Sequence, residues 1–140
     1  MLKTSLLHPE ILDAFGSNGH GSKLLIADGN YPFTTGVPEK AKKVFLNFSP
    51  GMLSVIDVLK VIKDVVPVES YLVMLPPDGA PQAIHEEFES ILGKEVSVTK
   101  VKRFDFYKEA RSEDTFLVIA TGEMRRFANI LITIGVVKSE

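Results

Sequence analysis

The sequence contains no cysteine, and this absence excludes several kinds of chemistry. Disulfide bonds, thiolate metal sites and a catalytic cysteine all require that side chain. The sequence also lacks an apolar run as long as a membrane span, and residues 1–7 contain only one lysine and too short an apolar run for a secretory signal. We therefore expect a cytoplasmic protein without a membrane partner.

An excess of charge of one sign is absent as well. The chain has 16 Lys and Arg against 18 Asp and Glu, a formal net charge of -2, and the two signs are mixed along its length. The one basic cluster, Lys40, Lys42 and Lys43, has no interleaved aromatic residues, so an exposed strand edge explains it best. We expect no nucleic-acid partner, because no field of one sign would attract a polyanion.

Several familiar motifs are missing. There is neither a Gly-x-Gly-x-x-Gly nor a Walker sequence, so a nucleotide cofactor has no recognisable binding loop. No Gly-x-Ser-x-Gly elbow supports a serine hydrolase. His8, His20 and His85 lack the short spacing of metal ligands, and His85 is interpreted as an ordinary residue of a helix. The sequence predicts no metal and no cofactor.

What is present is the composition of one folded domain spanning residues 1–140, with 45% apolar and 24% charged residues. We expect strands at 23–27, 44–48, 71–75, 96–101, 115–120 and 129–137, and helical segments after Pro9, from Ser49-Pro50, at 82–92 and at 104–111. This alternation predicts an α/β fold with a mostly parallel sheet covered by helices, and it leaves room for an antiparallel addition by the later strands.

A histidine and an aspartate flank the first predicted strand. His20 lies between Gly19 and Gly21 before the strand, and Asp28 follows it. Open α/β sheets bind ligands at the carboxyl ends of strands, and an imidazole of pKa roughly 6.5 suits proton transfer near neutral pH. A simple turn with a capping aspartate explains the same residues, so this pair alone does not define a reaction.

Two later segments also carry polar and aromatic groups. Arg103 and Tyr107 lie among phenylalanines, an arrangement that could bind a polyol or could equally be aromatic core with a surface arginine. The segment 121–129 is predicted as a polar hairpin loop between two apolar strands. Its last residue, Asn129, offers both hydrogen-bond donors and acceptors to a ligand.

Together these segments resemble the RbsD/FucU family of ribose pyranases and L-fucose mutarotases over nearly the whole chain. The order of the matching motifs is Gly19-His20-Gly21, a strand, Asp28, Arg103-Phe104-Asp105-Phe106-Tyr107, Thr121-Gly122-Glu123 and Phe127-Ala128-Asn129. The arginine-aromatic segment is similar to the fucose branch. Three residues depart from the family: Ser22 replaces an aspartate, Asn30 replaces a histidine and Phe127 replaces a tyrosine. The carboxylate that could orient or charge the histidine is therefore missing at position 22.

The resemblance implies an RbsD-like fold and a cofactor-independent isomerase. Such an enzyme interconverts anomers, or pyranose and furanose forms, of a free monosaccharide such as L-fucose or D-ribose by general acid-base catalysis. The resemblance implies that His20 is the general acid. It also implies that the sugar is bound by Asp28, Arg103, Phe127, Ala128 and Asn129, with Ser22, Asn30 and Tyr107 in supporting positions. We expect Asp28 to lie within one pocket's breadth of His20.

The resemblance also implies a ring-shaped homo-oligomer, commonly a decamer, with active sites near subunit contacts. The alternative is a non-catalytic monosaccharide-binding or transport-associated module. The altered residues Ser22, Asn30 and Phe127 favour that module, whereas the retained His20 favours the enzyme.

Overall fold

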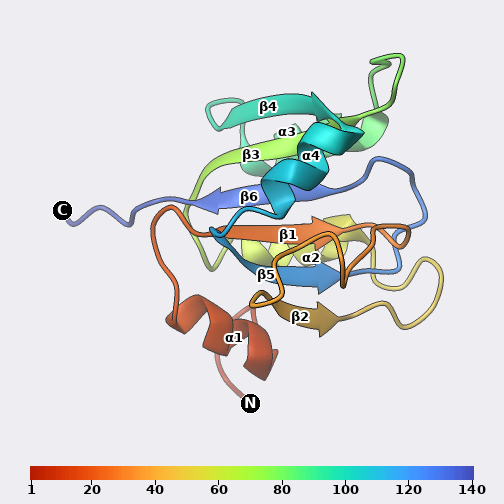
Figure 1. Cartoon of the computed structure of the whole chain (residues 1–140). Helices are drawn as coiled ribbons and strands as arrows, with labels where there is room; N and C mark the ends of the chain where they lie inside the picture. The colour runs from red at the N-terminus through yellow and green to blue at the C-terminus, as the bar shows by residue number, and fades with distance from the viewer.

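The computed structural model describes residues 1–140, with helices and strands alternating along the chain (Figure 1). The elements are α1 Pro9–Gly16, β1 Lys23–Ala27, β2 Lys42–Phe45, α2 Val55–Ile62, β3 Val68–Leu75, α3 Ala83–Leu92, β4 Ser97–Lys102, α4 Arg103–Ala110, β5 Thr115–Ala120 and β6 Ile130–Ile134. The strands form one six-stranded sheet in the order β2-β5-β1-β6-β3-β4. None of the helices is long and apolar enough to cross a membrane.

The sheet is mostly parallel, as predicted. β2, β5 and β1 pair in parallel, and so do β3 and β4. β6 is antiparallel to both of its neighbours, β1 and β3. The antiparallel strand thus lies inside the sheet, where its residues are nearly all buried, rather than at an edge. As a result, β1 through β5 all point the same way and end at the same edge of the sheet (Figure 1).

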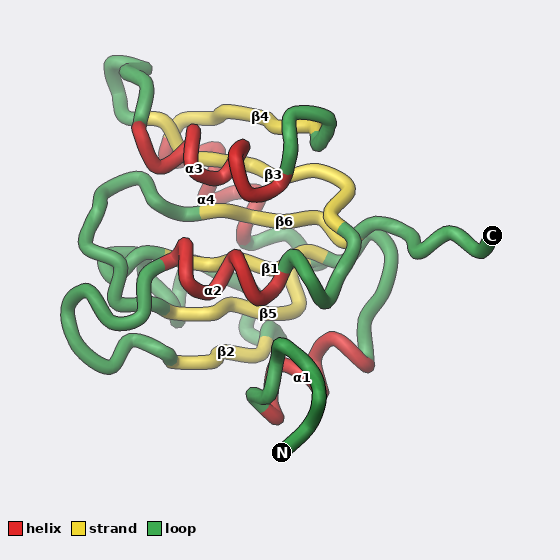
Figure 2. The backbone as a smooth tube through the Cα atoms, turned by 180° about the vertical axis from the view of Figure 1, so that it is seen from behind, coloured by secondary structure: helices red, strands yellow, loops and turns green.

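The sheet carries an apolar layer on each face. Leu24 and Ile26 of β1 pack in the larger cluster with residues of α1, α2 and α3, whereas Leu25 and Ala27 pack in a smaller cluster with α4 and the segment after β1. This division follows from the alternation of side chains along a strand. Figure 2 shows α2 and α3 over the face opposite α4.

One helix begins later than predicted. The sequence places a helix start at Ser49-Pro50, but Ser49 to Met52 forms a turn, and α2 begins after Ser54. The hydroxyl of Ser54 accepts a hydrogen bond from the Asp57 backbone N–H at 3.0 Å, and the Asp57 carboxylate accepts one from the Ser54 N–H at 3.0 Å. This capping box satisfies two amides that the first helical turn leaves free, which a proline at position 50 cannot do.

Candidate functional site

A pocket of about 790 Å³ lies where the parallel strands end. Asp28 follows β1, Lys102 ends β4 and Arg103 begins α4, so sheet topology alone brings these residues together. Asn129 joins them because it precedes the antiparallel β6, which starts at the edge where the other strands finish. The volume is within the range of small-molecule sites, roughly 300 to 1,000 Å³.

Asp28 and Asn129 form a rigid polar pair on the buried side of this pocket. The Asn129 side chain accepts a hydrogen bond from the Asp28 backbone N–H at 2.8 Å and donates one to the Asp28 carboxylate at 3.1 Å. The backbone N–H of Asn30 donates to the other carboxylate oxygen at 2.9 Å. Burial raises the pKa of Asp28 above 3.8, and hydrogen bonds from Asn30, Ala128 and Asn129 oppose this shift only in part. Ala128 contributes to lowering the pKa of Asp28 through a backbone hydrogen bond, and its side chain is fully buried.

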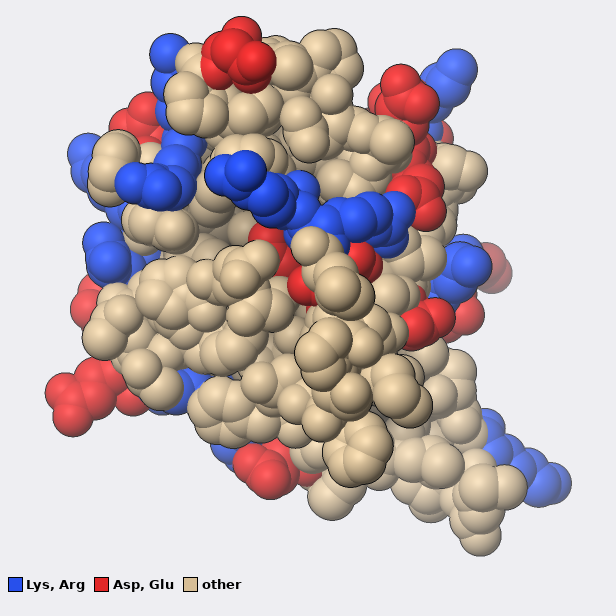
Figure 3. Space-filling view, turned by 90° about the vertical axis from the view of Figure 1, so that its right-hand side faces the viewer, with Lys and Arg blue, Asp and Glu red and all other residues tan.

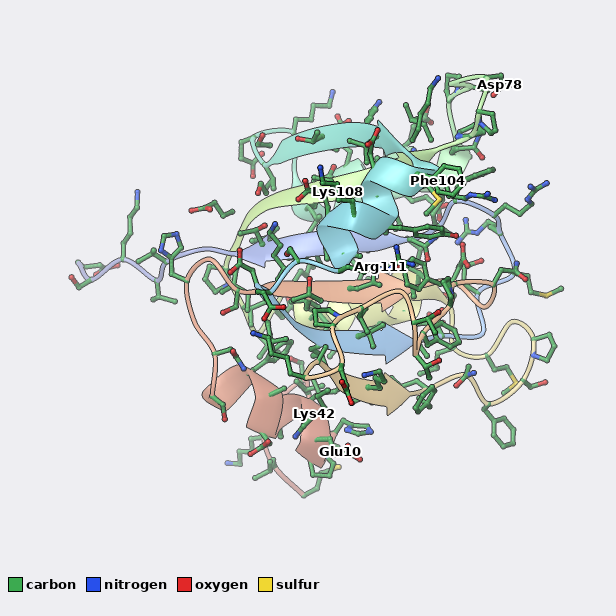
Figure 4. All side chains as sticks on the ribbon, in the orientation of Figure 1. Glu10, Lys42, Asp78, Phe104, Lys108 and Arg111 are labelled. Carbon is green, nitrogen blue, oxygen red and sulfur yellow. The ribbon has the colours of Figure 1, made fainter.

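Aromatic rings and cationic groups form the other walls. Tyr107 packs edge-on against Tyr31 with ring centroids 5.4 Å apart. The Arg103 guanidinium lies 4.7 Å from the centroid of the Phe104 ring. Figure 4 shows Phe104 at the end of α4 nearest the strand ends, with Lys108 farther along the helix. The pocket therefore contains these predicted site residues: Asp28, Asn30, Arg103, Tyr107, Phe127 and Asn129.

The segment 121–129 is not a hairpin loop, contrary to the prediction. β1 lies between β5 and β6, so the segment must cross over the end of β1. Thr121 anchors it there by donating its hydroxyl to the Ala27 carbonyl at 2.7 Å, and the Gly29 N–H donates to the Glu123 carbonyl at 2.9 Å. This crossing brings the Asn129 side chain within hydrogen-bonding distance of Asp28.

Glu123 is a buried anchor of the same segment. Its carboxylate accepts hydrogen bonds from the Arg125 Nε at 3.0 Å and Nη2 at 3.1 Å, and from the Val55 N–H at the start of α2 at 3.3 Å. Burial raises the pKa of Glu123, but the bonds and charge of Arg125 outweigh burial and hold it below the ordinary value. Arg125 also contacts Glu87 of α3. The sequence alone places Glu123 in a polar loop and in a family motif and assigns it no role of its own.

His85 supports the pocket wall from behind. Its Nε2 lies 3.0 Å from the Phe127 carbonyl oxygen, which can only accept, so Nε2 carries the proton. Phe127 has a φ of 58°, a left-handed conformation that is uncommon for a bulky residue. Burial lowers the pKa of His85. The spacing of His85 three residues before the buried Phe88 indicated an inward-facing residue, but the sequence interpretation missed this signal.

His20 lies outside this pocket, and the prediction that it is close to Asp28 within one chain is wrong. Gly21 N–H donates to the Ile134 carbonyl at 2.9 Å, which places the His20 turn at the far end of β6. The five residues of β1 separate this turn from Asp28; at about 3.3 Å per residue they span roughly 17 Å. Ser22 lies at the same far edge, and its backbone carbonyl accepts from the Ile134 N–H.

The His20 side chain is 57% exposed and contacts one carboxylate. Its Nε2 lies 3.0 Å from Oε1 of Glu69, near the start of β3. Glu69 was not singled out from the sequence. It supplies a carboxylate to the histidine in this chain, which has serine at position 22.

A mostly parallel α/β sheet with a polar and aromatic pocket at its strand ends defines a class of small-molecule-binding proteins. The chain belongs to the RbsD / FucU transport protein family, whose model matches residues 1–137. The structure is similar to that of Bacillus subtilis RbsD complexed with D-ribose, with a TM-score of 0.85 and 25% identity over 99% of this chain and 100% of that chain. The RbsD-like fold is thereby confirmed.

The relatives of this chain include proteins named fucose mutarotase and proteins named D-ribose pyranase, and their sequence identities to the chain are similar. A fucose mutarotase of Danio rerio is 30% identical over 97% of this chain and 93% of its own length. A D-ribose pyranase of Variovorax paradoxus strain S110 is 33% identical over 97% of this chain and 98% of its own length. These relatives are sugar isomerases by name. Their identities do not separate the fucose branch from the ribose branch.

Proposed function

We propose that this protein is a cofactor-independent sugar isomerase that interconverts the anomers or ring forms of a free monosaccharide such as L-fucose or D-ribose. The observation that carries the proposal is the Asp28–Asn129 pair, fixed by two mutual hydrogen bonds in a pocket with aromatic walls. Such a pair presents acceptors and donors to a polyol, and the rings cover its apolar faces. Membership of the family and the names of the relatives support the same activity.

The reaction requires only proton transfer. A cyclic hemiacetal opens when its ring oxygen gains a proton and its anomeric hydroxyl loses one, and closing reverses both steps. A well-placed acid or base contributes roughly 10² to 10⁴ in rate. Asp28, Arg103 and Asn129 would hold sugar hydroxyls, with charged partners forming the stronger hydrogen bonds. His20 would give the ring oxygen its proton.

His20 can fill this role only from another copy of the chain, because β1 separates it from the pocket of its own chain. We infer that the turn of one subunit reaches the pocket of the next. The exposure of His20 supports this inference. So do exposed apolar side chains in the segments that follow β2 and β5, where Phe48 is 87% and Met124 67% exposed. Large exposed apolar groups are typical of contact surfaces. We propose a ring-shaped homo-oligomer, such as a decamer.

Anomer exchange measured by magnetisation-transfer NMR on a panel of free sugars tests the activity. His20→Ala and His20→Gln should each lose most of the acceleration, roughly a hundredfold or more, since neither side chain is a comparable acid at neutral pH. His8→Gln is the matched control, because Nδ1 of His8 has no hydrogen-bond partner. His85→Ala is unsuitable as a control, since His85 holds the Phe127 carbonyl.

Undiminished exchange in both His20 variants would refute the mechanism. Binding of the sugars by the unmodified protein without faster exchange would replace the enzyme with a non-catalytic sugar-binding module.

A further inference from the structure

Three cationic side chains line the pocket without an acidic partner. Lys102, Arg103 and Arg126 come from the end of β4, the start of α4 and the segment that crosses β1. None of the three forms an ion pair, although Lys23, Lys42 and Arg125 elsewhere in the chain do. Figure 3, which looks onto this edge of the sheet, shows Lys and Arg side chains gathered near the middle of the face.

Within one chain, the acidic charge in the pocket does not balance these cations. Asp28 is the only acidic residue of the lining, and both of its carboxylate oxygens already accept hydrogen bonds. The first turn of α4 also contains an acidic residue, Asp105, but this residue is not part of the pocket lining. A neutral sugar brings no charge that this surplus could bind.

We propose that this site prefers a sugar with an anionic substituent, either a carboxylate or a phosphate ester, over the neutral parent sugar. The proposal rests on the proposed isomerase function and names its substrate class. Asp28 is 3% exposed, whereas the three cations are exposed. The sugar ring therefore lies deep, against Asp28 and Asn129, and its anionic group lies at the rim. Arginine suits this role because its planar fork matches the oxygens of both anions.

Two matched substrate series test this assignment. The first compares D-galactose, D-galacturonate and D-galactose 6-phosphate, and the second compares D-ribose with D-ribose 5-phosphate. We expect kcat/KM for anomer exchange to be about tenfold or more higher for an anionic member than for its neutral parent, as charge-assisted hydrogen bonds allow. A preference for galacturonate identifies the carboxylate, and a preference for a phosphate ester identifies the phosphate.

The variants Lys102→Gln and Arg126→Gln connect the preference to the cations. Each should lower the ratio of anionic to neutral kcat/KM by about tenfold, and added salt should lower it further. Lys108→Gln is the matched control, because Lys108 lies on the same helix as Arg103 but outside the pocket lining. Its ratio should equal that of the unmodified protein.

Equal kcat/KM for the neutral and anionic members of both series would overturn the proposal, as would a preference that is undiminished in the double variant Lys102→Gln/Arg126→Gln. Loss of the oligomer in that variant with an unchanged ratio would also overturn it and would assign the cations to a subunit contact. The absence of exchange with every sugar would instead count against the isomerase function. Calorimetry with galacturonate and the phosphate esters would then still measure whether the site prefers anions.

Discussion

Glu69 occupies a position at the His20 turn that gives it a defined part in the proposed mechanism. Its carboxylate accepts the Nε2 proton of His20 at 3.0 Å, so Nδ1 is the nitrogen left to exchange a proton with the sugar. The carboxylate also fixes the orientation of a ring whose flanking glycines provide no packing. Ser22 cannot do this, since its side chain forms no hydrogen bond with the ring.

Replacing Glu69 with Gln should lower kcat for anomer exchange by about tenfold, the effect of losing one charge-assisted hydrogen bond. KM should change little, because Glu69 contacts the imidazole rather than the sugar. Glu69→Asp, which keeps a carboxylate, should recover part of the rate. Saturation kinetics by NMR measures both constants, and a thermal melt checks that the variants fold alike. An unchanged kcat in Glu69→Gln would show that the contact has no catalytic role.

The residues that line the pocket were easier to predict from the sequence than the residues that hold the site in place, Glu69 and Glu123. Asp28 follows an apolar strand and Asn129 precedes one, so both positions are visible as changes in hydropathy along the chain, whereas Arg103 was assigned from the family resemblance. Glu69 was not found because it is 49 residues from its partner, and no local pattern connects the two. Glu123 was given no role for a related reason: its partner at the start of α2, the Val55 N–H, is brought near only by the fold.

Element types were predictable, but neighbours in the sheet were not. The predicted strands at 23–27 and 115–120 match β1 and β5 residue for residue, because after its first residue each is an unbroken apolar run. Whether β5 pairs with β6 or with β1 depends on contacts between distant residues, which periodicity does not report. Two predictions were wrong because the order of the strands in the sheet was not predicted: the hairpin at 121–129 and the short distance between His20 and Asp28 within one chain.

The contact between α3 and the segment 121–129 should make stability depend on pH. Burial lowers the pKa of His85 in the folded chain below 6.5, so the unfolded chain binds more protons as the pH falls through this value. Folding therefore favours the neutral ring, and stability is lost on acidification. His85→Gln keeps a donor for the Phe127 carbonyl but cannot titrate.

Between about pH 7.5 and 5.5 the melting temperature should consequently fall more for the unmodified protein than for His85→Gln. Differential scanning calorimetry of both proteins in matched buffers measures this difference. Parallel pH dependence in the two proteins would show that His85 does not control stability in this range.

At the scale of the whole molecule, the two halves of the proposed site lie at opposite edges of the sheet. A contact that joins one edge to the other is head-to-tail, and such contacts close into rings when the rotation allows. The apolar side chains beside the pocket and the exposed Val136 and Val137 at the other edge are the surfaces this contact would cover. Each site would then take His20 from one chain and Asp28 from its neighbour.

Mixed assemblies test this sharing directly. Asp28→Asn and His20→Ala should each be nearly inactive alone. Refolded together in equal amounts, they should regain activity in about one site in four, the share in which both contributing residues are unmodified. NMR exchange rates measure the recovery, and light scattering confirms that mixed oligomers form. Mixed oligomers without recovered activity would exclude a shared site, and an active monomer would exclude the assembly itself.

If sites are shared as proposed, the length of β1 makes protein concentration a control on the reaction. A chain with the acid and the pocket on opposite edges would have no complete site in isolation, so the site would form only when subunits associate. Dilution below the dissociation constant of the ring would then remove the catalyst without unfolding any chain, by mass action alone. A newly synthesised subunit would be inactive until the concentration of subunits was high enough for the ring to assemble.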